Sequence, residues 1–308
     1  MSKKKWTTED IPDLTEKVII VTGANSGIGF EATKEFVRKG AETILACRNE
    51  EKASKAFDRI KKEIPDAKIK VMQLDLASLK SIHQFTEEFK KQYSRLDVLL
   101  NNAGIMMDPY GTTEDGFERQ VGINHLGHFA LTGLLFDLIA NTSGARVVNV
   151  SSNGHRVGNM DFTNFLYKDG KGYTRTGAYG RSKLANLLFT YELDRRFRKA
   201  NINAIAVAAH PGASRTELGR SELLRIGKII LYPMTLIMSQ NAANGALPSI
   251  RAAVDPEVQG SDYYGPSGIG EMKGYPIKVE SSKASHNEED AKKLWEISEE
   301  LTGVKYSI

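Results

Sequence analysis

A tyrosine and a lysine four residues apart are the side chains whose types and spacing most directly suggest chemistry in this sequence. Tyr179 and Lys183 belong to the segment YGRSK, and on a helix such residues project from one face about one turn apart. A phenol with a pKa of about 10 is a poor base at neutral pH, but a neighbouring ammonium group favours the phenolate and lowers that pKa. Tyr179 could then exchange a proton with a substrate oxygen while a hydride moves to or from the adjacent carbon.

Ser152 is expected to join this pair, although it precedes Tyr179 by 27 positions. It ends the apolar segment ARVVNVSS, which reads as a buried strand, and open α/β sheets bind ligands at the carboxyl edge of their strands. Its hydroxyl can steady the same substrate oxygen. A tyrosine–lysine pair at this spacing often marks only a helix surface, so the prediction of a catalytic centre also depends on the serine and on a glycine loop upstream.

That glycine loop is the segment TGANSGIG (22–29), which lies where the first apolar strand gives way to the first helix. Its G-x-x-x-G-x-G spacing allows a tight turn and close approach of the backbone to a ligand, and the N-terminus of the helix offers free N–H groups to a pyrophosphate. A glycine-rich turn without a ligand is the alternative, but the position between strand and helix favours nucleotide binding. The residues predicted to contact the cofactor here are Gly23, Asn25, Ser26, Gly27, Ile28 and Gly29.

The residue that follows the second predicted strand indicates which dinucleotide is bound. An Asp or Glu at this place holds the 2′-hydroxyl of the NAD ribose, whereas an Arg accommodates the 2′-phosphate of NADP. Arg48 stands there, in the segment ACRN. A surface arginine near a helix start is the alternative interpretation, and the adjacent Glu50 and Glu51 weaken the case for a positive pocket. On this criterion the sequence predicts NADP(H) as the cofactor.

A parallel sheet is needed to bring these residues together, and the sequence alternates short apolar runs with amphipathic stretches as such a sheet requires. Runs that are apolar throughout indicate strands buried on both faces. The predicted fold is α/β, a single domain over 1–308 with a Rossmann-type doubly wound parallel sheet flanked by helices. The predicted strands are 17–23, 42–48, 68–76, 96–104, 145–152 and 202–212, with a last strand within 260–268. The predicted helices are 26–40, 50–64, 78–93, 114–140, 178–199 and 288–301, the last with Leu294 and Trp295 facing inward.

Composition limits the classes of partner. The 308 residues carry 42 basic and 38 acidic side chains, a net charge of +4, and the only basic run is Lys3 to Lys5, so no nucleic acid is expected as a partner. The single cysteine, Cys47, excludes an intrachain disulfide and fits a reducing compartment. No signal peptide is visible, and the apolar run 229–238 is shorter than the about 20 residues of a membrane span. We therefore expect a cytoplasmic protein, and whether 223–238 touches a membrane surface is left open.

The histidines do not form a metal-binding pattern. His125, His128, His155 and His210 are scattered, without an H-E-x-x-H segment or a paired carboxylate. Structural polar roles are expected for them, and no metal is predicted.

Together and in this order, the motifs resemble the short-chain dehydrogenase/reductase family over most of residues 14–265. The resemblance implies a catalytic set of Asn124, Ser152, Tyr179 and Lys183, in which Asn124, from NHLGHF, helps to hold a water in a proton relay to the lysine. It also implies further cofactor contacts from the segments LDLAS, NNAG and HPGASRT. These contacts are Asp75 and Leu76 at the adenine, Asn102, Ala103 and Gly104 at the adenine ribose, and Pro211, Gly212 and Thr216 over the nicotinamide amide.

Within the family, the segments ACRN, INHLGHF, SKLAN and HPGASRTEL resemble the retinol-dehydrogenase-like branch. Many members of that branch prefer NADP(H), which agrees with Arg48, and reduction is the direction that this preference implies. The wide spacing from Ser152 to Tyr179 is also similar to that branch. Family members commonly form dimers or tetramers through helices equivalent to 114–140 and 178–199. A homodimer is therefore expected, although members with the long loop include monomers.

Two irregular regions flank the predicted centre and are expected to shape the substrate site. A loop as long as 153–178 is usually functional or disordered in a compact domain. In family terms, 217–240 is the substrate lid, and its many apolar side chains suggest a hydrophobic ketone, aldehyde or alcohol. A role of these side chains in the core or in a subunit contact is an equal alternative.

A protein of another class could use the same fold. A regulator or redox sensor that binds NADP(H) without turnover would have the glycine loop, since fold alone does not establish function. Such a protein would be expected to lose the tyrosine or the lysine, whereas this sequence keeps Asn124, Ser152, Tyr179 and Lys183. The sequence therefore favours an enzyme that transfers a hydride between NADP(H) and a carbonyl or alcohol.

Overall fold

A computed structural model describes residues 5–213 and 240–308 of the chain. Eight strands from these residues form one sheet in the order β3-β2-β1-β4-β5-β6-β7-β8. All neighbouring strands are parallel except β7 and β8, which pair antiparallel. The strands are β1 Val18–Thr22, β2 Glu42–Cys47, β3 Ile69–Gln73, β4 Val98–Asn101, β5 Ala145–Val150, β6 Ala204–Ala209, β7 Tyr263–Pro266 and β8 Pro276–Lys278.

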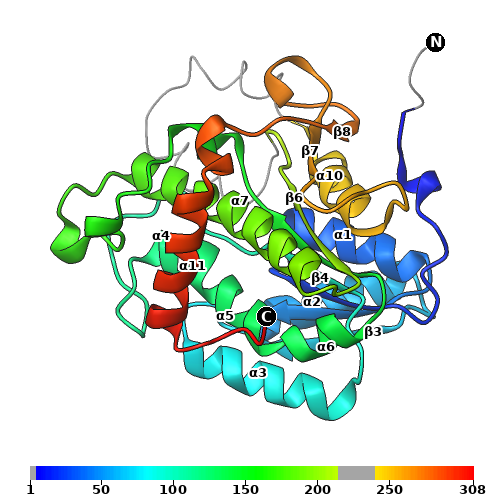
Figure 1. Ribbon diagram of the computed structural model, residues 1–308. Helices are drawn as coiled ribbons and strands as arrows, with labels where there is room; N and C mark the ends of the chain where they lie inside the picture. Colours follow the sequence, from blue (N-terminus) through cyan, green and yellow to red (C-terminus); the bar gives the residue numbers. More distant parts are fainter. Residues whose placement is uncertain (1–4, 214–239) are drawn as a thin grey trace.

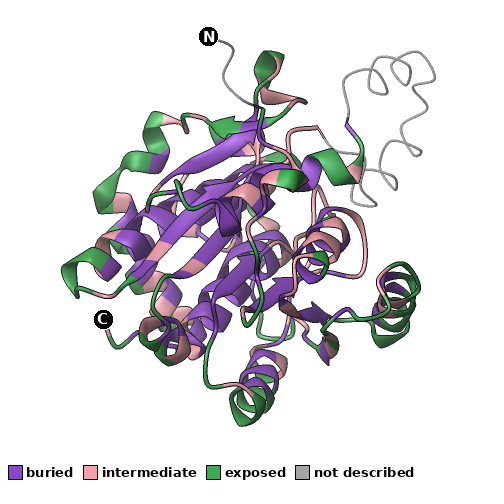
Figure 2. Cartoon of the chain, turned by 90° about the vertical axis from the view of Figure 1, so that its right-hand side faces the viewer, coloured by how far each residue is buried: buried purple, intermediate pink, exposed green. Residues whose placement is uncertain are grey.

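Helices cover both faces of this sheet (Figure 1). The helices α1 Gly27–Arg38, α2 Glu50–Glu63 and α10 Ala242–Val254 pack on one face, around Phe36, Ile60 and Ile250. The other face is covered by α3 Leu79–Gln92, α5 Gly127–Leu134, α6 Phe136–Asn141, α7 Arg175–Lys199 and α11 Glu288–Thr302. Figure 2 shows the strands between the two layers as almost wholly buried and the outer sides of the helices as exposed.

The strand order confirms the predicted doubly wound α/β fold. Chain connections run from β1 outward to β2 and β3, then return to β4 on the other side of β1 and continue outward. Loops that follow β1 and β4 therefore diverge in opposite directions and leave a crevice at the carboxyl edge of the sheet, which is where such folds bind ligands.

One predicted helix, 114–140, is wrong in its start and in its continuity. Residues 112–118 form a turn closed by a bridge between Thr112 and Glu118, and helix α4 begins only at Arg119. A π-helical turn, Gly122–Leu126, then precedes α5. A Cβ on Gly127 would lie 2.5 Å from the main-chain oxygen of Leu76, so the close approach of backbones here needs glycine. Residues 119–134 are thus helical throughout, with the π-helical turn in the middle, and the turn at Leu135 separates α5 from α6.

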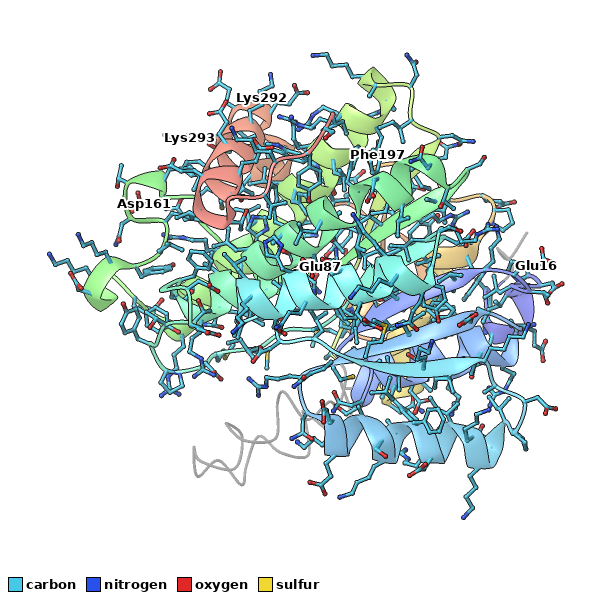
Figure 3. The ribbon with its side chains drawn as sticks, turned by 90° about the horizontal axis from the view of Figure 1, so that it is seen from below. Glu16, Glu87, Asp161, Phe197, Lys292 and Lys293 are labelled. Atoms are coloured by element: carbon cyan, nitrogen blue, oxygen red, sulfur yellow. The ribbon has the colours of Figure 1, made fainter. Side chains whose placement is uncertain are left out.

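The long loop 153–178 is ordered, with three short 3-10 helices at Asn153–Val157, Phe162–Asn164 and Lys168–Gly170. Arg181 of α7 holds it, because the buried guanidinium donates hydrogen bonds to the main-chain oxygens of Asn159, Asn164 and Phe165. Lys293 of α11 also reaches it, with Nζ 5.0 Å from the ring centre of Phe162, and Figure 3 shows Lys293 beside Asp161. The loop's last residues belong to α7, which begins at Arg175, three residues before the predicted start.

Among the α-helices and strands that the structure describes, two were not predicted. Helix α10 contains Pro248 in its interior, and β8 is a strand of three residues that begins at a proline. The C-terminal helix was predicted within one residue, and Leu294 and Trp295 are buried as expected. Thr216, almost all of the predicted lid and the apolar segment 223–238 lie outside the described residues. Among residues 5–213 and 240–308, no helix is both long and apolar enough to cross a bilayer.

Candidate active site

A cavity of about 580 Å³ at the carboxyl edge of the sheet collects almost all of the predicted site residues. Its volume is in the range of small-molecule and cofactor pockets. The predicted residues that line it are Gly23, Asn25, Ser26, Gly27, Ile28, Gly29, Arg48, Asp75, Leu76, Asn102, Ala103, Gly104, Ser152, Tyr179, Lys183, Pro211 and Gly212. Asn124 is the one described member of the predicted set that does not line the cavity.

The glycine loop forms one wall of the cavity, and two of its glycines leave no room for a side chain. Gly23 has a φ of +67°, and a Cβ there would lie 3.0 Å from the Cα of Ala103. A Cβ on Gly29 would lie 2.6 Å from both the main-chain oxygen of Gly23 and Nδ2 of Asn102. Backbone therefore packs directly on backbone in this wall, as a turn that cradles a pyrophosphate requires.

Thr22 joins the glycine loop to the segment after β4. Its Oγ1 accepts hydrogen bonds from the N–H groups of Asn102 and Ala103, each at 2.9 Å, and its main-chain oxygen accepts one from Nδ2 of Asn102. The hydroxyl also lies 2.9 Å from Nε2 of the buried His128. Because Nδ1 of His128 lies 3.1 Å from the main-chain oxygen of Asn124, which can only accept, the proton is assigned to Nδ1 and Nε2 accepts from Thr22. Burial lowers the pKa of His128 to about 4, which keeps the ring neutral.

The N-terminus of α1 forms part of the same wall of the cavity. Its N-cap, Ser26, makes no capping hydrogen bond with its side chain, so the hydroxyl is available beside the free N–H groups of the first turn. The helix is 12 residues long, and its dipole favours an anion at this end. These features fit the pyrophosphate of a dinucleotide.

Arg48 lies at the cavity rim, directly after β2, with an exposed side chain. Within residues 5–213 and 240–308 this side chain has no hydrogen bond or ion pair, since Asn49 caps α2 through Lys52 and Glu51 pairs with Lys55. Glu50 and Glu51, the acidic neighbours that weakened the sequence argument, thus form no ion pair with Arg48.

Asp75 and Leu76 follow β3 and complete the far end of the cavity. The carboxylate of Asp75 accepts the N–H of Ala77 at 2.9 Å, and the N–H of Asp75 donates to Ser81 at the start of α3. Local hydrogen bonds therefore hold this residue, to which the resemblance assigns the adenine contact.

Ser152 and Tyr179 face each other across Gly154. Ser152 is the N-cap of the 3-10 helix Asn153–Val157, and its Oγ accepts the N–H of Gly154 at 3.1 Å. A Cβ on Gly154 would lie 2.9 Å from Cε1 of Tyr179 and 3.5 Å from Oγ of Ser152. The absence of a side chain at Gly154 lets the phenol ring lie next to the serine.

The pKa of Tyr179 differs from the expectation. Burial raises it above the ordinary value of a tyrosine, and a smaller opposite contribution comes from the hydroxyl of Ser152. Nζ of Lys183 is 5.9 Å from the centre of the phenol ring, and burial lowers the pKa of this lysine to about 8. In the chain alone, desolvation therefore outweighs the lowering of the tyrosine pKa that the ammonium was expected to cause.

Lys183 is buried and points toward the junction of β4 and β5. Its Nζ donates a hydrogen bond to the main-chain oxygen of Val150 at 3.0 Å. Nζ also lies 3.6 Å from the position that a Cβ on Gly104 would take, so glycine keeps this approach open. The lysine thus stands between the serine-bearing strand and the segment Asn102–Gly104.

Asn124 lies in the π-helical turn, and its side chain is fully engaged. Its Oδ1 accepts the N–H of Ile105, and its Nδ2 donates to the main-chain oxygen of Ile105 and to Oγ of Ser182. Such π-turns within helices occur often at functional sites. Asn124 thereby fixes the segment after Gly104 beside Lys183, and the relay water implied by the resemblance stays a prediction.

The turn after β6 brings Pro211 and Gly212 to the cavity. Gly212 has a φ of +63°, and a Cβ there would lie 2.4 Å from the main-chain oxygen of Met272. The loop between β7 and β8 therefore packs closely on this turn.

Several residues that line the cavity were missed, among them Ile105, Met106, Asp108, Ile123, Ser151 and Ala213. The segment 105–108 continues from NNAG at the carboxyl edge of β4, so its place in the chain could have identified it. Gln120, a buried residue of α4, holds this segment by accepting the N–H of Met107. No local pattern marks such a contact, because Gln120 lies beyond the intervening turn.

No histidine among the described residues lines the cavity, and the others form hydrogen bonds of a structural kind. Nδ1 of His155 donates to the main-chain oxygen of Ser152, and its Nε2 accepts the N–H of Ser282. Nε2 of His125 lies 3.0 Å from Oγ of Ser298 in α11. Among the residues that the structure describes, no group of His, Cys, Asp and Glu could hold a metal ion.

Comparisons with known proteins agree with this geometry. A family model described as short chain dehydrogenase matches residues 17–224. Human retinol dehydrogenase 13 is 40% identical over 292 residues, which cover 94% of this chain and 85% of that protein. Zebrafish WW domain-containing oxidoreductase is 42% identical over 298 residues, 94% of this chain and 69% of its own length.

Solved structures show the same fold. An uncharacterised protein from Mycobacterium paratuberculosis superposes with a TM-score of 0.82 at 35% identity, over 99% of this chain and 100% of that one. A short chain dehydrogenase from Shigella flexneri, complexed with NADP, has a TM-score of 0.62 at 26% identity, over 79% of this chain and 93% of that one.

Proposed function

Because the chain belongs to the short-chain dehydrogenase family and is retinol-dehydrogenase-like, we propose that it reduces an apolar carbonyl compound with NADPH. When bound, the cofactor supplies the hydride. One observation carries the proposal: a single cavity is lined by the glycine loop, by Arg48 and by Ser152, Tyr179 and Lys183. A nucleotide and a substrate oxygen bound there would lie against the same group of side chains.

Tyr179 is proposed as the group that gives a proton to the substrate oxygen. Its pKa is raised by burial, so the phenol keeps its proton at neutral pH and is ready to act as an acid. The hydroxyl of Ser152, across Gly154, steadies the same oxygen. Lys183 is mostly protonated at neutral pH, since its pKa is about 8, and its charge favours the phenolate that proton transfer leaves behind. This protonation pattern supports reduction rather than oxidation.

NADP(H) is proposed over NAD(H) because of Arg48. Its guanidinium is exposed at the rim and unpaired among the described residues, which leaves its donors available for a 2′-phosphate. The related Shigella structure is complexed with NADP, which supports the assignment. Close backbone packing at Gly23 and Gly29 fits the pyrophosphate between the two nucleotides.

An apolar substrate is proposed from the wall nearest the catalytic residues. Ile105, Met106 and Ile123 line the cavity there. The names of the relatives, retinol dehydrogenases of man and mouse, point in the same direction. The expectations of a cytoplasmic location and of a homodimer stay predictions.

A regulator that binds NADP(H) without turnover is the alternative from another class. The placement of Tyr179 between Ser152 and Lys183 favours catalysis, because a binding protein has no need of an ionisable phenol at the cavity.

The first test is calorimetric titration of the protein with NADPH, NADH and NADP⁺ side by side, followed by a screen of apolar aldehydes and ketones. We expect tight binding of the phosphorylated cofactors. Tyr179→Phe should lower kcat by about 10²- to 10⁴-fold with little change in NADPH affinity. Tyr110→Phe is the matched control, since Tyr110 is 40% exposed. Unchanged turnover in Tyr179→Phe would remove this residue from the mechanism, and the absence of turnover in the wild type with intact binding would favour the regulator.

A further inference from the structure

The loop that joins β7 to β8, residues 267–275, is coloured orange in Figure 1. It contacts two parts of the active site: the turn His210–Ala213 and the residues that follow Ser152. Hydrogen bonds within the loop close it tightly, from Ser267 to Tyr275 and from Gly268 to Lys273, each at 2.8 Å. It lies beyond residues 17–224, the part of the chain that the family model matches.

On one side, the loop holds the turn His210–Ala213. The N–H of Ala213 donates to the main-chain oxygen of Met272 at 2.8 Å. A Cβ on Gly212 would lie 2.8 Å from the main-chain oxygen of Glu271, so the two backbones are in direct contact. Gln240 adds a second tie, because it accepts the N–H of Gly274 and donates to the main-chain oxygen of Pro211.

On the other side, the loop holds the residues that follow the catalytic serine. Nδ2 of Asn153 donates to the main-chain oxygen of Gly270 at 3.1 Å. The guanidinium of Arg156 lies 3.7 Å from Oε1 of Glu271. Since Asn153 is next to Ser152, a shift of the loop would be transmitted to the serine.

Glu271 is the side chain at the centre of these contacts. Its Oε2 lies 2.9 Å from Nε2 of the fully buried His210. Among the described residues, neither of these two atoms has a partner with the geometry of a hydrogen bond. Nδ1 of His210 accepts the N–H of Gly212, so Nε2 carries a proton and faces the carboxylate. The pKa of Glu271 is lowered, first by this contact with His210, so the group stays an anion.

The backbone of Glu271 is also held in an unfavourable conformation. Its φ is +56°, in the left-handed region that side chains other than glycine rarely adopt. Surrounding contacts must therefore hold the residue there, and such strain is concentrated at functional positions. A carboxylate is placed at this point of the loop despite a local cost that glycine would avoid.

We propose that Glu271 is a positioning residue that fixes the turn His210–Ala213 relative to Ser152, through His210 on one side and the loop contacts with Asn153 and Arg156 on the other. The inference rests on the proposed function, because this turn is where the nicotinamide half of the cofactor is expected. Its effect is confined to that half, since none of the contacts of Glu271 with the described residues reaches the glycine loop or Arg48.

The test measures kcat and the binding of NADPH and of its adenosine half in three variants of Glu271. In Glu271→Ala, we expect kcat to fall about tenfold or more, since small misplacements of reacting groups cost up to about 100-fold. The NADPH dissociation constant should rise about three- to tenfold, while that of 2′,5′-ADP, the adenosine half alone, should stay within about twofold. Glu271→Gln, whose amide oxygen can still face Nε2 of His210, should recover part of the loss.

Glu271→Gly separates the carboxylate from the backbone. Glycine relieves the left-handed conformation, so this variant should unfold at a temperature no lower than that of the wild type, yet show the same loss of kcat as the alanine variant. Glu280→Ala is the matched control, because Glu280 is exposed and Arg156 contacts only its main-chain oxygen. It should leave all four readouts unchanged.

The outcomes separate this inference from the proposed function. Wild-type protein that binds NADPH and reduces a carbonyl, with all Glu271 variants equal to it, overturns the inference alone. Equal weakening of NADPH and 2′,5′-ADP in Glu271→Ala shows a general structural role and also overturns it. Wild-type protein that binds neither ligand overturns the proposed function and the inference with it.

Discussion

Residues 22–29 line the cavity, and residues 153–178 connect two other residues that line it, Ser152 and Tyr179, but different kinds of contact hold the two segments in place. In the first region, backbone packs on backbone at Gly23 and Gly29, with Thr22 as a short bridge to Asn102. In the second, one long side chain, the guanidinium of Arg181, reaches across a gap to three main-chain oxygens. The first arrangement tolerates no added atom, whereas the second depends on a few replaceable hydrogen bonds.

This difference predicts how each region responds to substitution. A binding wall made of close backbone contacts should lose ligand affinity on any increase in side-chain volume. A loop held by a side chain should lose order locally when that side chain is changed, while the glycine loop keeps its shape. Four predictions are given in order of the effect that we expect on cofactor binding and use, from the largest to the smallest.

The largest effect is expected for Gly29→Ala. Its Cβ would lie 2.6 Å from the main-chain oxygen of Gly23, which cannot move without opening the turn. We expect NADPH affinity, measured by calorimetry, to fall about 100-fold or more, and the free energy of unfolding to drop by about 1–3 kcal/mol. Gly111→Ala is the control, since its nearest atom, at 3.0 Å, belongs to the flexible side chain of Arg119. Normal affinity in Gly29→Ala would contradict the tight backbone wall.

A smaller effect is expected for Arg48→Asp at the rim of the cavity. Here the proposed contact with the cofactor is made by a side chain, whereas the glycine loop offers backbone. Arg48→Asp should lower the ratio of kcat/KM for NADPH to that for NADH by about 10- to 100-fold, the range of a hydrogen bond to a charged group. Lys55→Asp on α2 makes the same charge change away from the cavity and should leave the ratio unchanged. If both variants shift the ratio equally, general electrostatics rather than Arg48 reads the phosphate.

The third prediction concerns Lys183, which lines the same cavity as the glycine loop. Because its pKa is about 8, the ammonium form is present below that pH and lost above it, whereas Tyr179 stays protonated through this range. We expect kcat/KM for NADPH to be constant from pH 6 to 7 and to fall about tenfold per unit well above pH 8. Arg48→Asp should lower the curve without moving its inflection. A profile that stays flat beyond pH 9.5 would show that the charge of Lys183 is not needed.

The same difference explains what the sequence could predict. Gly23, Gly29 and Arg48 line one cavity, as their positions at strand ends predicted, because the geometry of the fold brings the strand ends together. The π-helical turn before Gly127 was missed, and the close approach of Leu76 to Gly127 joins residues that are distant in the chain. The contact of Glu271 with His210 joins residues 61 positions apart and leaves no local pattern. The raised pKa of Tyr179 reflects burial, which spacing alone does not give.

The smallest effect on the cofactor is expected for Arg181→Met, which sharpens the comparison most. The variant keeps an apolar stem of similar length but removes the donors to Asn159, Asn164 and Phe165. We expect the free energy of unfolding to fall by about 1–3 kcal/mol, and amide hydrogen exchange to rise in 159–165. NADPH affinity should stay within about twofold, because the glycine wall has no contact with this guanidinium among the described residues. Lys199→Met, on the exposed last turn of α7, controls for loss of charge and should leave the exchange rates unaltered. Loss of NADPH affinity in Arg181→Met equal to that in Gly29→Ala would mean that the two regions form one cooperative unit.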